Sequence, residues 1–410
     1  MSNQRSQPRF IAPEFVRDLE DHFLRVQPEN GYYVYHIEQL KQHLAKLQQQ
    51  DVVKLWFAVK ANPLSSVIKT IADQGFSFDV ASQGELEQVL AQGVSPQNIL
   101  NTGPAKSRQQ IARFIDRGVA IFVVESINQL VWLNEVAEQK RVTPKVLLRV
   151  QLQWPEGEKN PLGGNELTPF GLATQQWQTL TIADYQHVNI CGIHIFQWGN
   201  MLSNAKMFEL WSQMIPPLSQ LAETLGFDLD ILDLGGGLGI DYLQTGQAIN
   251  WSTAMQDLAE IKEKANVKEI WLELGRYAVA QSGYYIAPIV DRKDNFGSQQ
   301  LILAGGINHL LRPAITNQPF PTRLLRTSAS ECEHFHVHGP LCTSLDKLGE
   351  FDFPQDVKEG DALVFGLCGA YGFTESMPFF LCHDIAAEYI FVDQNFELIR
   401  EPQAPQWYLR

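Results

Sequence analysis

The chain has 410 residues, which is more than one ordinary compact core needs, so we expect two domains. Apolar residues make up 45% and charged residues 19%, proportions typical of a soluble globular protein and unlike those of a disordered one. The net charge of -14 disfavours nucleic-acid binding, which needs a basic face.

The N-terminus, MSNQRSQPRF, lacks the apolar core of a signal peptide, and no run of about 18 apolar residues indicates a membrane span. We therefore expect a cytoplasmic protein. The five cysteines are odd in number and include no CxxC pair, so neither a disulfide scaffold nor a zinc ribbon is expected.

From about residue 37 to residue 280, short apolar segments alternate with segments whose apolar residues recur three and four apart. Residues 53–59 (VKLWFAV) are followed by 64–75 (LSSVIKTIADQG), whose serines are suited to capping a helix. Strands separated by helices of this length form parallel βαβ units, and so many in series predict a closed (β/α)8 barrel. An open doubly wound sheet is the alternative. Further strands are expected at 76–81, 120–124, 145–150, 190–196, 230–236 and 269–275.

After residue 280 the sequence changes to short β-rich runs separated by glycine, proline and aspartate, such as 300–306 (QLILAGG) and 387–393 (AEYIFVD). This pattern predicts a separate antiparallel β domain. Residues 31–37 (GYYVYHI) are also strand-like and fit either domain.

Functional side chains of a (β/α)8 barrel lie at the C-terminal ends of its strands. Lys60 follows such a strand in WFAVKANP, and an amine desolvated there has a lowered pKa and can form a Schiff base. The alternative is a lysine that reaches out to solvent. Other side chains at expected strand ends are those of Asp79, Arg149, His194 and Glu273.

Two further motifs at strand ends are suited to binding a ligand. Three glycines at 235–237 allow backbone amides to approach a phosphate, although their spacing is not that of a dinucleotide-binding loop. In the sequence ELGR, Glu273 and Arg276 are spaced to face one ligand from different sides. A tight turn and a surface ion pair are the respective alternatives.

Two motifs of the β domain contain groups that could take part in chemistry. Cys342 follows a Gly-Pro turn, which places its thiol on a loop, although a free cysteine is more often an inert small hydrophobic residue. Cys332, His334, His336 and His338 alternate along one strand. Neighbours on one strand face are about 7 Å apart, too far for several to bind one ion readily, so we expect no metal site.

Six motifs occur in a recognisable order: FAVKANP, DVASQGE, GGG, ELGR, GPLC and GAYG. Over nearly its whole length the chain resembles the fold-type III pyridoxal phosphate decarboxylases, the family of diaminopimelate, ornithine and arginine decarboxylases. The resemblance implies an alanine-racemase-like barrel over residues 37–280. It also implies a β domain formed by residues 1–36 and 281–410.

The resemblance further implies a decarboxylase that binds pyridoxal 5'-phosphate through a Schiff base on Lys60. It places Glu273 beside the pyridine nitrogen and makes Cys342, from the neighbouring subunit of a homodimer, the acid that protonates Cα. It assigns Gly236, Gly237, Gly275 and Arg276 to the phosphate, Asp79, Glu85 and Arg149 to support of the lysine and ring, and Tyr371 to the cofactor from the partner side.

Residues 192–200 (GIHIFQWGN) depart from the family pattern, which has a histidine stacked on the ring and a serine near the phosphate. Counted from Gly192, Phe196 takes the stacking position and Gly199 the serine position. His194 lies close enough in sequence to remain an alternative for stacking.

Tyr371 is also expected to bind substrate, together with three residues that bear on the identity of the substrate. Thr343 replaces the acidic residue that pairs with a distal ammonium, and Thr316 replaces a tyrosine, whereas Arg312 is retained and suits a carboxylate. We therefore expect a modified or acylated amino acid, as in siderophore pathways. Alternatives are meso-diaminopimelate for lysine biosynthesis, ornithine or lysine. More remote are a racemase and an inactive homologue that binds a protein partner.

Overall fold

The computed structural model describes residues 10–154, 167–407 and 409. The chain divides into two compact units, a barrel unit and a β unit. The barrel unit comprises His43–Ile240 and Gln247–Ala278. The β unit comprises Met1–Gln42, Asp241–Gly246 and Val279–Arg410. Within the described residues, no helix is both long and apolar enough to cross a membrane.

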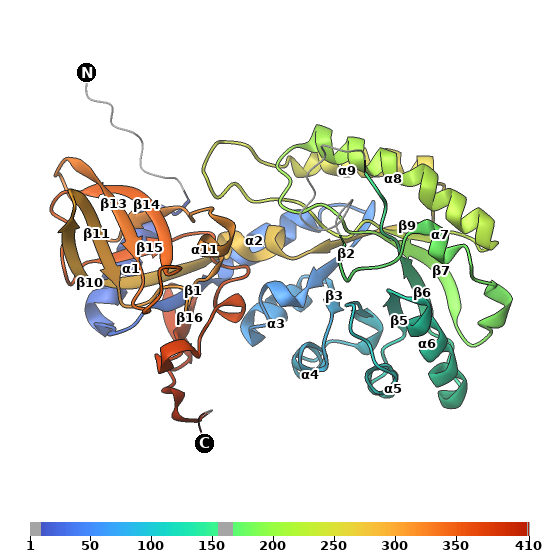
Figure 1. Ribbon diagram of the computed structural model, residues 1–410. Helices are drawn as coiled ribbons and strands as arrows, with labels where there is room; N and C mark the ends of the chain where they lie inside the picture. Colours follow the sequence, from blue (N-terminus) through green and yellow to red (C-terminus); the bar gives the residue numbers. More distant parts are fainter. Residues whose placement is uncertain (1–9, 155–166, 408, 410) are drawn as a thin grey trace. The chain divides into compact units, whose positions relative to one another are not determined.

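The barrel unit is built around a closed barrel of eight parallel strands, which confirms the predicted barrel and excludes the open sheet (Figure 1). The strands are β2 (Val53–Ala58), β3 (Ser77–Val80), β4 (Ile99–Asn101), β5 (Ile121–Val124), β6 (Lys145–Arg149), β7 (Asn189–His194), β8 (Ile231–Asp233) and β9 (Glu269–Leu274). They pair in chain order, and β9 closes the barrel by pairing with β2.

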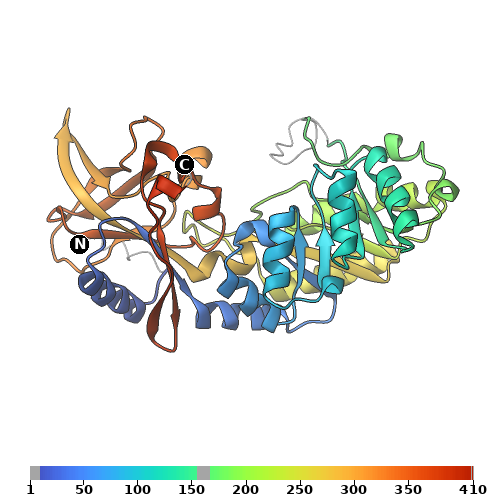
Figure 2. The ribbon, with the colours of Figure 1, turned by 90° about the horizontal axis from the view of Figure 1, so that it is seen from below.

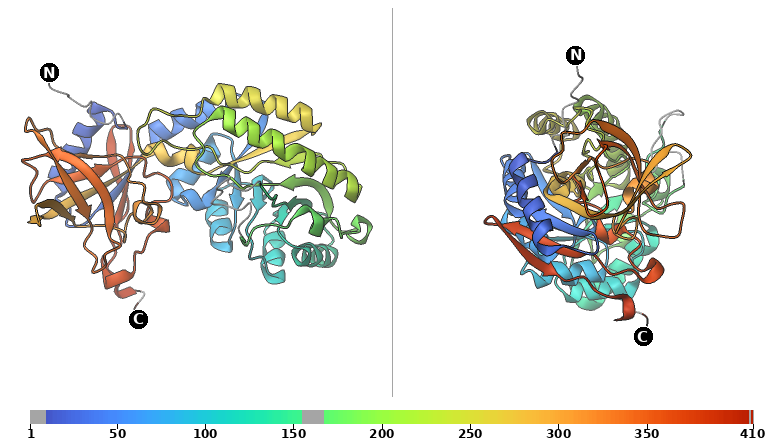
Figure 3. Two further views of the ribbon diagram at one scale, coloured as in Figure 1. Left: turned by 45° about the horizontal axis from the view of Figure 1, so that its top comes forward. Right: turned by 90° about the vertical axis from the view of Figure 1, so that its left-hand side faces the viewer.

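Helices surround the strands, with α3 to α6 over one side and α8 beside α9 on another (Figures 2 and 3). These elements are α2 (Ile37–Leu47), α3 (Ser65–Asp73), α4 (Gln83–Ala91), α5 (Arg108–Asp116), α6 (Ile127–Lys140), α7 (Thr174–Trp177), α8 (Asn204–Leu225), α9 (Trp251–Ala265) and α10 (Arg276–Val279). Ser82, Ser107 and Ser126 cap α4, α5 and α6, each accepting a hydrogen bond from a backbone N–H three residues later. Each such cap stabilises its helix by about 1 kcal/mol.

The helix α3 begins differently from the prediction. Its N-cap is Leu64, which makes no side-chain cap, so the expected serine cap is wrong. The side chain of Asn62 accepts a hydrogen bond from the Leu64 N–H at 3.1 Å and shapes the entry to the helix instead. The turn after β2, which contains Lys60, is therefore stabilised by the side chain of Asn62.

Apolar side chains fill part of the barrel interior. Trp56 and Trp271, whose ring centroids are 4.7 Å apart, belong to one buried apolar cluster with Leu147 and Ile231. Burying large apolar side chains is the main stabilising contribution of such a core. Because this apolar cluster stabilises the barrel, polar side chains can be accommodated at the ends of its strands.

The β unit contains a nine-stranded sheet in the order β14-β13-β11-β10-β1-β16-β17, with β15 pairing β10 and β12 pairing β15. Its strands are β1 (Tyr32–His36), β10 (Gly283–Asn295), β11 (Ser298–Leu303), β12 (Thr322–Leu324), β13 (Cys332–His338), β14 (Lys347–Pro354), β15 (Ala362–Phe365), β16 (Ala387–Val392) and β17 (Asn395–Arg400). Most pairs are antiparallel, as predicted, whereas β1 with β16 and β11 with β13 are parallel. The helices are α1 (Pro13–Val26) and α11 (Arg312–Thr316).

The histidine-rich strand β13 alternates as its sequence indicates. Phe335 and Val337 point into the core, and the intervening His334 and His336 are much more exposed. His334 Nδ1 lies 3.0 Å from Asp352 Oδ1, and His336 Nδ1 lies 3.1 Å from Glu350 Oε1 on the neighbouring strand β14. This face is therefore a solvated one with cross-strand polar pairs.

Candidate active site

Polar side chains gather at the C-terminal ends of the barrel strands. Among them are five buried ionisable side chains from five different strands: Asp79, Arg149, His194, Asp233 and Glu273. Because the strands are parallel, these ends meet at one mouth of the barrel. The predicted convergence of Asp79, Arg149, His194 and Glu273 on one barrel end is thus what the topology produces.

Lys60 lies in a single 3-10 turn, Val59–Ala61, that directly follows β2. Its side chain is exposed in the single chain, so the expectation of a dry pocket is wrong for the isolated subunit. Its positive charge nevertheless interacts with Asp79, Glu85 and Glu273 and contributes a lowering of the pKa of each carboxyl group. The amine thus lies within electrostatic range of three carboxyl groups.

Asp79, the penultimate residue of β3, is a buried carboxyl group. Thr102, at the end of the neighbouring strand β4, donates a hydrogen bond from its hydroxyl to Asp79 Oδ1 at 2.5 Å. Burial, followed by the repulsion of Glu273, raises the pKa of Asp79 to about 8, although Lys60 and the Thr102 hydroxyl act in the opposite direction. Asp79 can therefore hold a proton near neutral pH in the absence of any bound ligand.

Glu273 lies in the barrel interior beside His194. His194 Nε2 is 3.1 Å from Glu273 Oε1, and both side chains are buried. Burial alone raises the pKa of Glu273, but the His194 ring, its hydrogen bond and the charges of Lys60 and Arg149 outweigh it, so the net direction is downward. The surroundings therefore favour Glu273 as a carboxylate.

Asp233 completes a cluster of three titratable groups, and its role was not foreseen from the sequence. One oxygen of Asp233, one of Glu273 and a ring nitrogen of His194 lie within 4.8 Å of one another. Among the described residues, Asp233 Oδ2 and His194 Nδ1 have no hydrogen-bond partner although both are buried. Burial and the nearby Glu273 raise the pKa of Asp233 well above its ordinary value, which favours its neutral form.

Arg149 is held by a second buried network. Its Nη1 donates to Glu125 Oε1 at 3.0 Å, and its guanidinium lies 4.5 Å from the ring centroid of Phe170. Lys106 Nζ lies 4.0 Å from the same Glu125 oxygen, and burial lowers the pKa of this lysine to about 8 despite that carboxylate. Glu125 and Lys106 were missed from the sequence, and both orient Arg149.

The glycine loop after β8 packs tightly against neighbouring backbone. A Cβ on Gly236 would collide with the carbonyl oxygen of Glu273, and Gly237 has a φ of +99° and would bring a Cβ within 2.6 Å of the Trp198 carbonyl oxygen. Only glycine therefore fits at these two positions. Met201 N–H donates to the Gly237 carbonyl at 2.8 Å, which aligns the loop containing Gly199 with the glycine loop.

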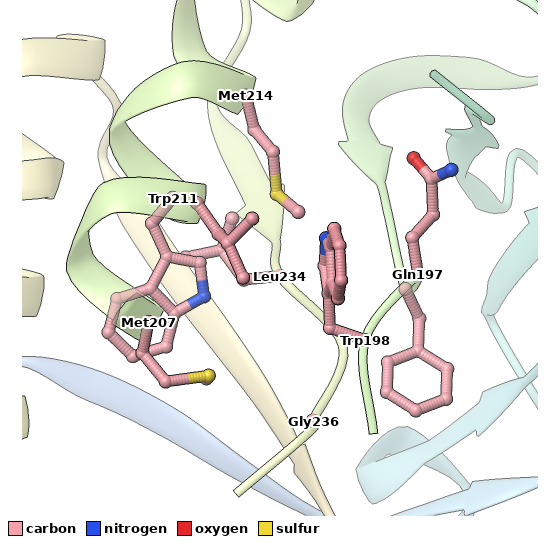
Figure 4. Close-up of a pocket in the computed structure, with 9 residues that line it drawn as sticks. Gln197, Trp198, Met207, Trp211, Met214, Leu234 and Gly236 are labelled. Carbon is pink, nitrogen blue, oxygen red and sulfur yellow. The ribbon is translucent and has the colours of Figure 1, made fainter. Parts of the chain in front are cut away.

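Phe196 lies against the glycine loop, since a Cβ on Gly235 would come within 2.6 Å of Phe196 Cβ. It borders a small apolar cavity between the glycine loop and α8, where Trp198, Met207, Trp211 and Leu234 converge (Figure 4). Phe196 is partly exposed, whereas His194 points into the barrel at Glu273. The two residues thus differ in environment despite lying two positions apart.

The loop with Cys342 belongs to the β unit. Cys342 is a free, exposed thiol, and Thr343 follows it with its hydroxyl accepting the Leu345 N–H at 3.2 Å. Asp346 anchors this loop, because its two oxygens accept the backbone N–H groups of Leu341 and Ile307 at 2.8 Å each. The sequence did not single out Asp346, although it holds the cysteine loop in shape.

Arg312, Tyr371 and Glu375 lie together in the β unit. The Arg312 guanidinium carbon is 4.8 Å from the Tyr371 ring centroid. Arg312 Nη1 donates to both oxygens of Glu375, at 2.8 and 2.7 Å. Thr316 is exposed and its hydroxyl donates to the Arg312 carbonyl at 2.7 Å, so it stabilises the short helix α11 from within.

The donor set of the barrel mouth fits pyridoxal phosphate. It offers an amine on Lys60 for the aldehyde, a buried carboxylate on Glu273 for the pyridine nitrogen, and a glycine loop and Arg276 for an anion. Beside Glu273, the buried atoms His194 Nδ1 and Asp233 Oδ2 lack a hydrogen-bond partner among the described residues and are available to a polar group. Fold and donors together define a (β/α)8 enzyme class that binds this cofactor.

A family model for the pyridoxal binding domain of pyridoxal-dependent decarboxylases matches residues 36–280. The chain therefore belongs to the pyridoxal-dependent decarboxylases, and it is a pyridoxal-phosphate-dependent carboxy-lyase. The resemblance drawn from the six sequence motifs is thereby confirmed.

Relatives with named activities match most of the chain. The 2-[(L-alanin-3-ylcarbamoyl)methyl]-2-hydroxybutanedioate decarboxylase of Staphylococcus aureus is 27% identical over 382 residues, covering 89% of this chain and 95% of its own. The diaminopimelate decarboxylase of Haemophilus influenzae is 31% identical over 324 residues, covering 77% and 76%. The crystal structure of the Helicobacter pylori diaminopimelate decarboxylase with L-lysine has a TM-score of 0.84 at 22% identity, covering 95% and 98%, which confirms the fold.

Proposed function

We propose that the protein removes the α-carboxylate of an amino acid whose side chain is acylated, using pyridoxal phosphate held by Lys60. The observation that carries the cofactor assignment is the position of Lys60 directly after β2, within electrostatic range of Asp79, Glu85 and Glu273. When bound, the cofactor takes up the electron pair released as carbon dioxide leaves.

The barrel residues have complementary roles in this proposal. Glu273, kept ionised by His194, would hold a proton on the pyridine nitrogen, and Phe196 would offer an aromatic face to the ring. His194 is assigned to Glu273 and not to stacking, because its ring nitrogen points at that carboxylate. Asp79 and Glu85 support the amine of Lys60, and Arg149 supports the ring.

The phosphate is assigned to backbone amides and one guanidinium. Gly236 and Gly237 on one loop, and Gly275 with Arg276 after β9, supply N–H groups and a positive charge. Gly199 takes the place of a serine, so this position contributes only backbone to the phosphate site.

Cys342 is proposed as the acid that protonates Cα, delivered by the second subunit of a homodimer. Its exposure on an anchored loop supports this role, because a group that acts on a neighbouring subunit must be accessible. Tyr371 accompanies it from the same side.

The acylated substrate is inferred from Thr343 and from one relative. A closed site without an acidic partner disfavours a free distal ammonium, and Thr343 offers only a hydroxyl. The name of the Staphylococcus aureus relative describes an alanine unit joined through an amide to a hydroxydicarboxylate. Arg312 suits such a carboxylate, and Thr316 lies one turn further along α11. The second candidate is meso-diaminopimelate, favoured by the Haemophilus influenzae relative.

A release assay for carbon dioxide tests the proposal directly. We expect release from β-succinylated diaminopropionate and slow or no release from meso-diaminopimelate, ornithine and lysine. Efficient turnover of meso-diaminopimelate with none of the acylated compound would contradict the substrate assignment. Racemisation without carbon dioxide release would contradict the reaction itself.

Mixing two inactive variants tests the shared site. Lys60→Ala and Cys342→Ala are each expected to be inactive, whereas random subunit exchange between them should restore about one quarter of wild-type activity. Half of the mixed dimers are then heterodimers, and each has one intact site. Mixing Lys60→Ala with Glu273→Ala is the matched control, because both changes lie in the barrel and no intact site can form. Failure of the first mixture to recover despite proven exchange would show that each site is built from one chain.

A further inference from the structure

Glu375 binds the guanidinium of Arg312 through one nitrogen, Nη1. Both oxygens of Glu375 accept from Arg312 Nη1, at 2.8 and 2.7 Å. A guanidinium has five N–H donors in a planar fork, and Nε and Nη2 of Arg312 make no hydrogen bond with the described residues. One edge of the guanidinium is therefore anchored while the opposite edge keeps its donors.

Two further contacts restrain this pair. The Arg312 guanidinium carbon lies 4.8 Å from the Tyr371 ring centroid, a cation–π contact that restrains the guanidinium. The Leu311 N–H donates to Ser376 Oγ at 3.1 Å, and Ser376 Oγ donates to the Gly372 carbonyl at 2.9 Å. The start of α11 and the Phe373–Glu375 turn are thus tied together beside the ion pair.

We propose that Glu375 is a positioning residue that presents the Nε and Nη2 edge of Arg312 to a carboxylate on the acyl group of the substrate. This inference rests on the proposed function. A carboxylate binds a guanidinium edge with two parallel hydrogen bonds, so it can bind at that edge while Glu375 stays on Nη1. The Glu375 side chain is 34% exposed, so water screens its repulsion of a second carboxylate.

The opposite account is that Glu375 competes with the substrate for Arg312. The two accounts differ in the effect of removing the side chain. If Glu375 positions Arg312, alanine at this site releases a long flexible side chain and weakens carboxylate binding. If Glu375 competes, alanine frees the guanidinium and strengthens it.

The test compares two probes on the holoenzyme: β-succinylated diaminopropionate, and β-butyrylated diaminopropionate, which has a methyl group in place of the distal carboxylate. The readout is the ratio of kcat/KM for the two probes, with KM and kcat reported separately. Wild-type enzyme should favour the succinylated probe at least about tenfold. This factor corresponds to the contribution of about 1.4 kcal/mol expected from hydrogen bonds between the guanidinium and the distal carboxylate. Arg312→Gln should lose this preference.

Glu375→Ala should reduce the preference at least about fivefold through KM, whereas Glu375→Gln should retain most of it, because its amide oxygen still accepts from Nη1. Thr374→Ala, an exposed neighbour on the same turn, is the control and should keep the wild-type ratio. Bound-cofactor absorbance of each variant verifies folding.

An unchanged or increased preference in Glu375→Ala overturns the positioning role while leaving the decarboxylase intact. An equal loss in both Glu375 variants also overturns it, because the charge and not the hydrogen bond would then matter. No carbon dioxide from either probe with wild-type enzyme overturns the proposed substrate class and this inference with it.

Discussion

Lys60→Ala is expected to abolish the visible absorbance band of the bound cofactor and to lower kcat for decarboxylation at least about a thousandfold. Lys60 has two contributions that this change removes together. In the proposed function its amine would make the covalent bond to the aldehyde, and its charge acts on the pKa values of Asp79, Glu85 and Glu273. Absorption spectroscopy of purified protein with added pyridoxal phosphate, and carbon dioxide release, measure both losses.

Lys60→Arg separates the two contributions. An arginine keeps the positive charge at the end of β2 but stays protonated and makes no covalent bond to the aldehyde, so we expect it to be as inactive as alanine. Lys69→Ala is the matched control, because Lys69 is an exposed lysine of the next helix that forms a surface ion pair with Asp73 at 3.5 Å. A Lys60→Arg variant that kept the band and the activity would refute the assignment of Lys60.

The barrel could be predicted because short sequence patterns indicate its strands and the starts of its helices. Each strand is a short apolar run, and Ser82, Ser107 and Ser126 mark the starts of three following helices with their own side chains. This alternation predicts parallel βαβ units, and their number favours a closed barrel, in which consecutive strands pair in chain order, over an open doubly wound sheet. The β unit is less determined by local pattern, and its two parallel pairs, β1 with β16 and β11 with β13, join segments far apart in the chain.

The supporting residues of the site could not be predicted in the same way. Glu125 and Asp233 each end or follow a strand, which is the signal that identified Asp79 and Glu273, but the order of the strands does not say which of these side chains meet Arg149 or His194. Glu375 gives no local signal, because its partner Arg312 lies 63 residues earlier. Such pairings depend on tertiary contacts, and only the folded chain reveals them.

Glu273→Gln is expected to lower kcat about a hundredfold to a thousandfold while the cofactor still binds through Lys60. The amide keeps the shape of the side chain and one acceptor oxygen for His194, but it has no charge to hold a proton on the pyridine nitrogen. The residue would then no longer favour uptake of the electron pair that is released with carbon dioxide. Steady-state kinetics with the succinylated probe, together with the absorbance of the bound cofactor, separate the loss of rate from any loss of binding.

The same strand provides the control. Glu269→Gln makes the same substitution at the other end of β9, where Glu269 is exposed and accepts the Trp271 indole N–H at 2.7 Å, and it should leave kcat near the wild-type value. His194→Gln should fall between the two, because it removes the ring that keeps Glu273 ionised while leaving the carboxylate in place. A Glu273→Gln enzyme with wild-type kcat would mean that the cluster of His194, Asp233 and Glu273 serves the packing of the barrel and not the cofactor. The order of kcat among these three variants therefore tests whether the Glu273 carboxylate takes part in the reaction or only stabilises the barrel.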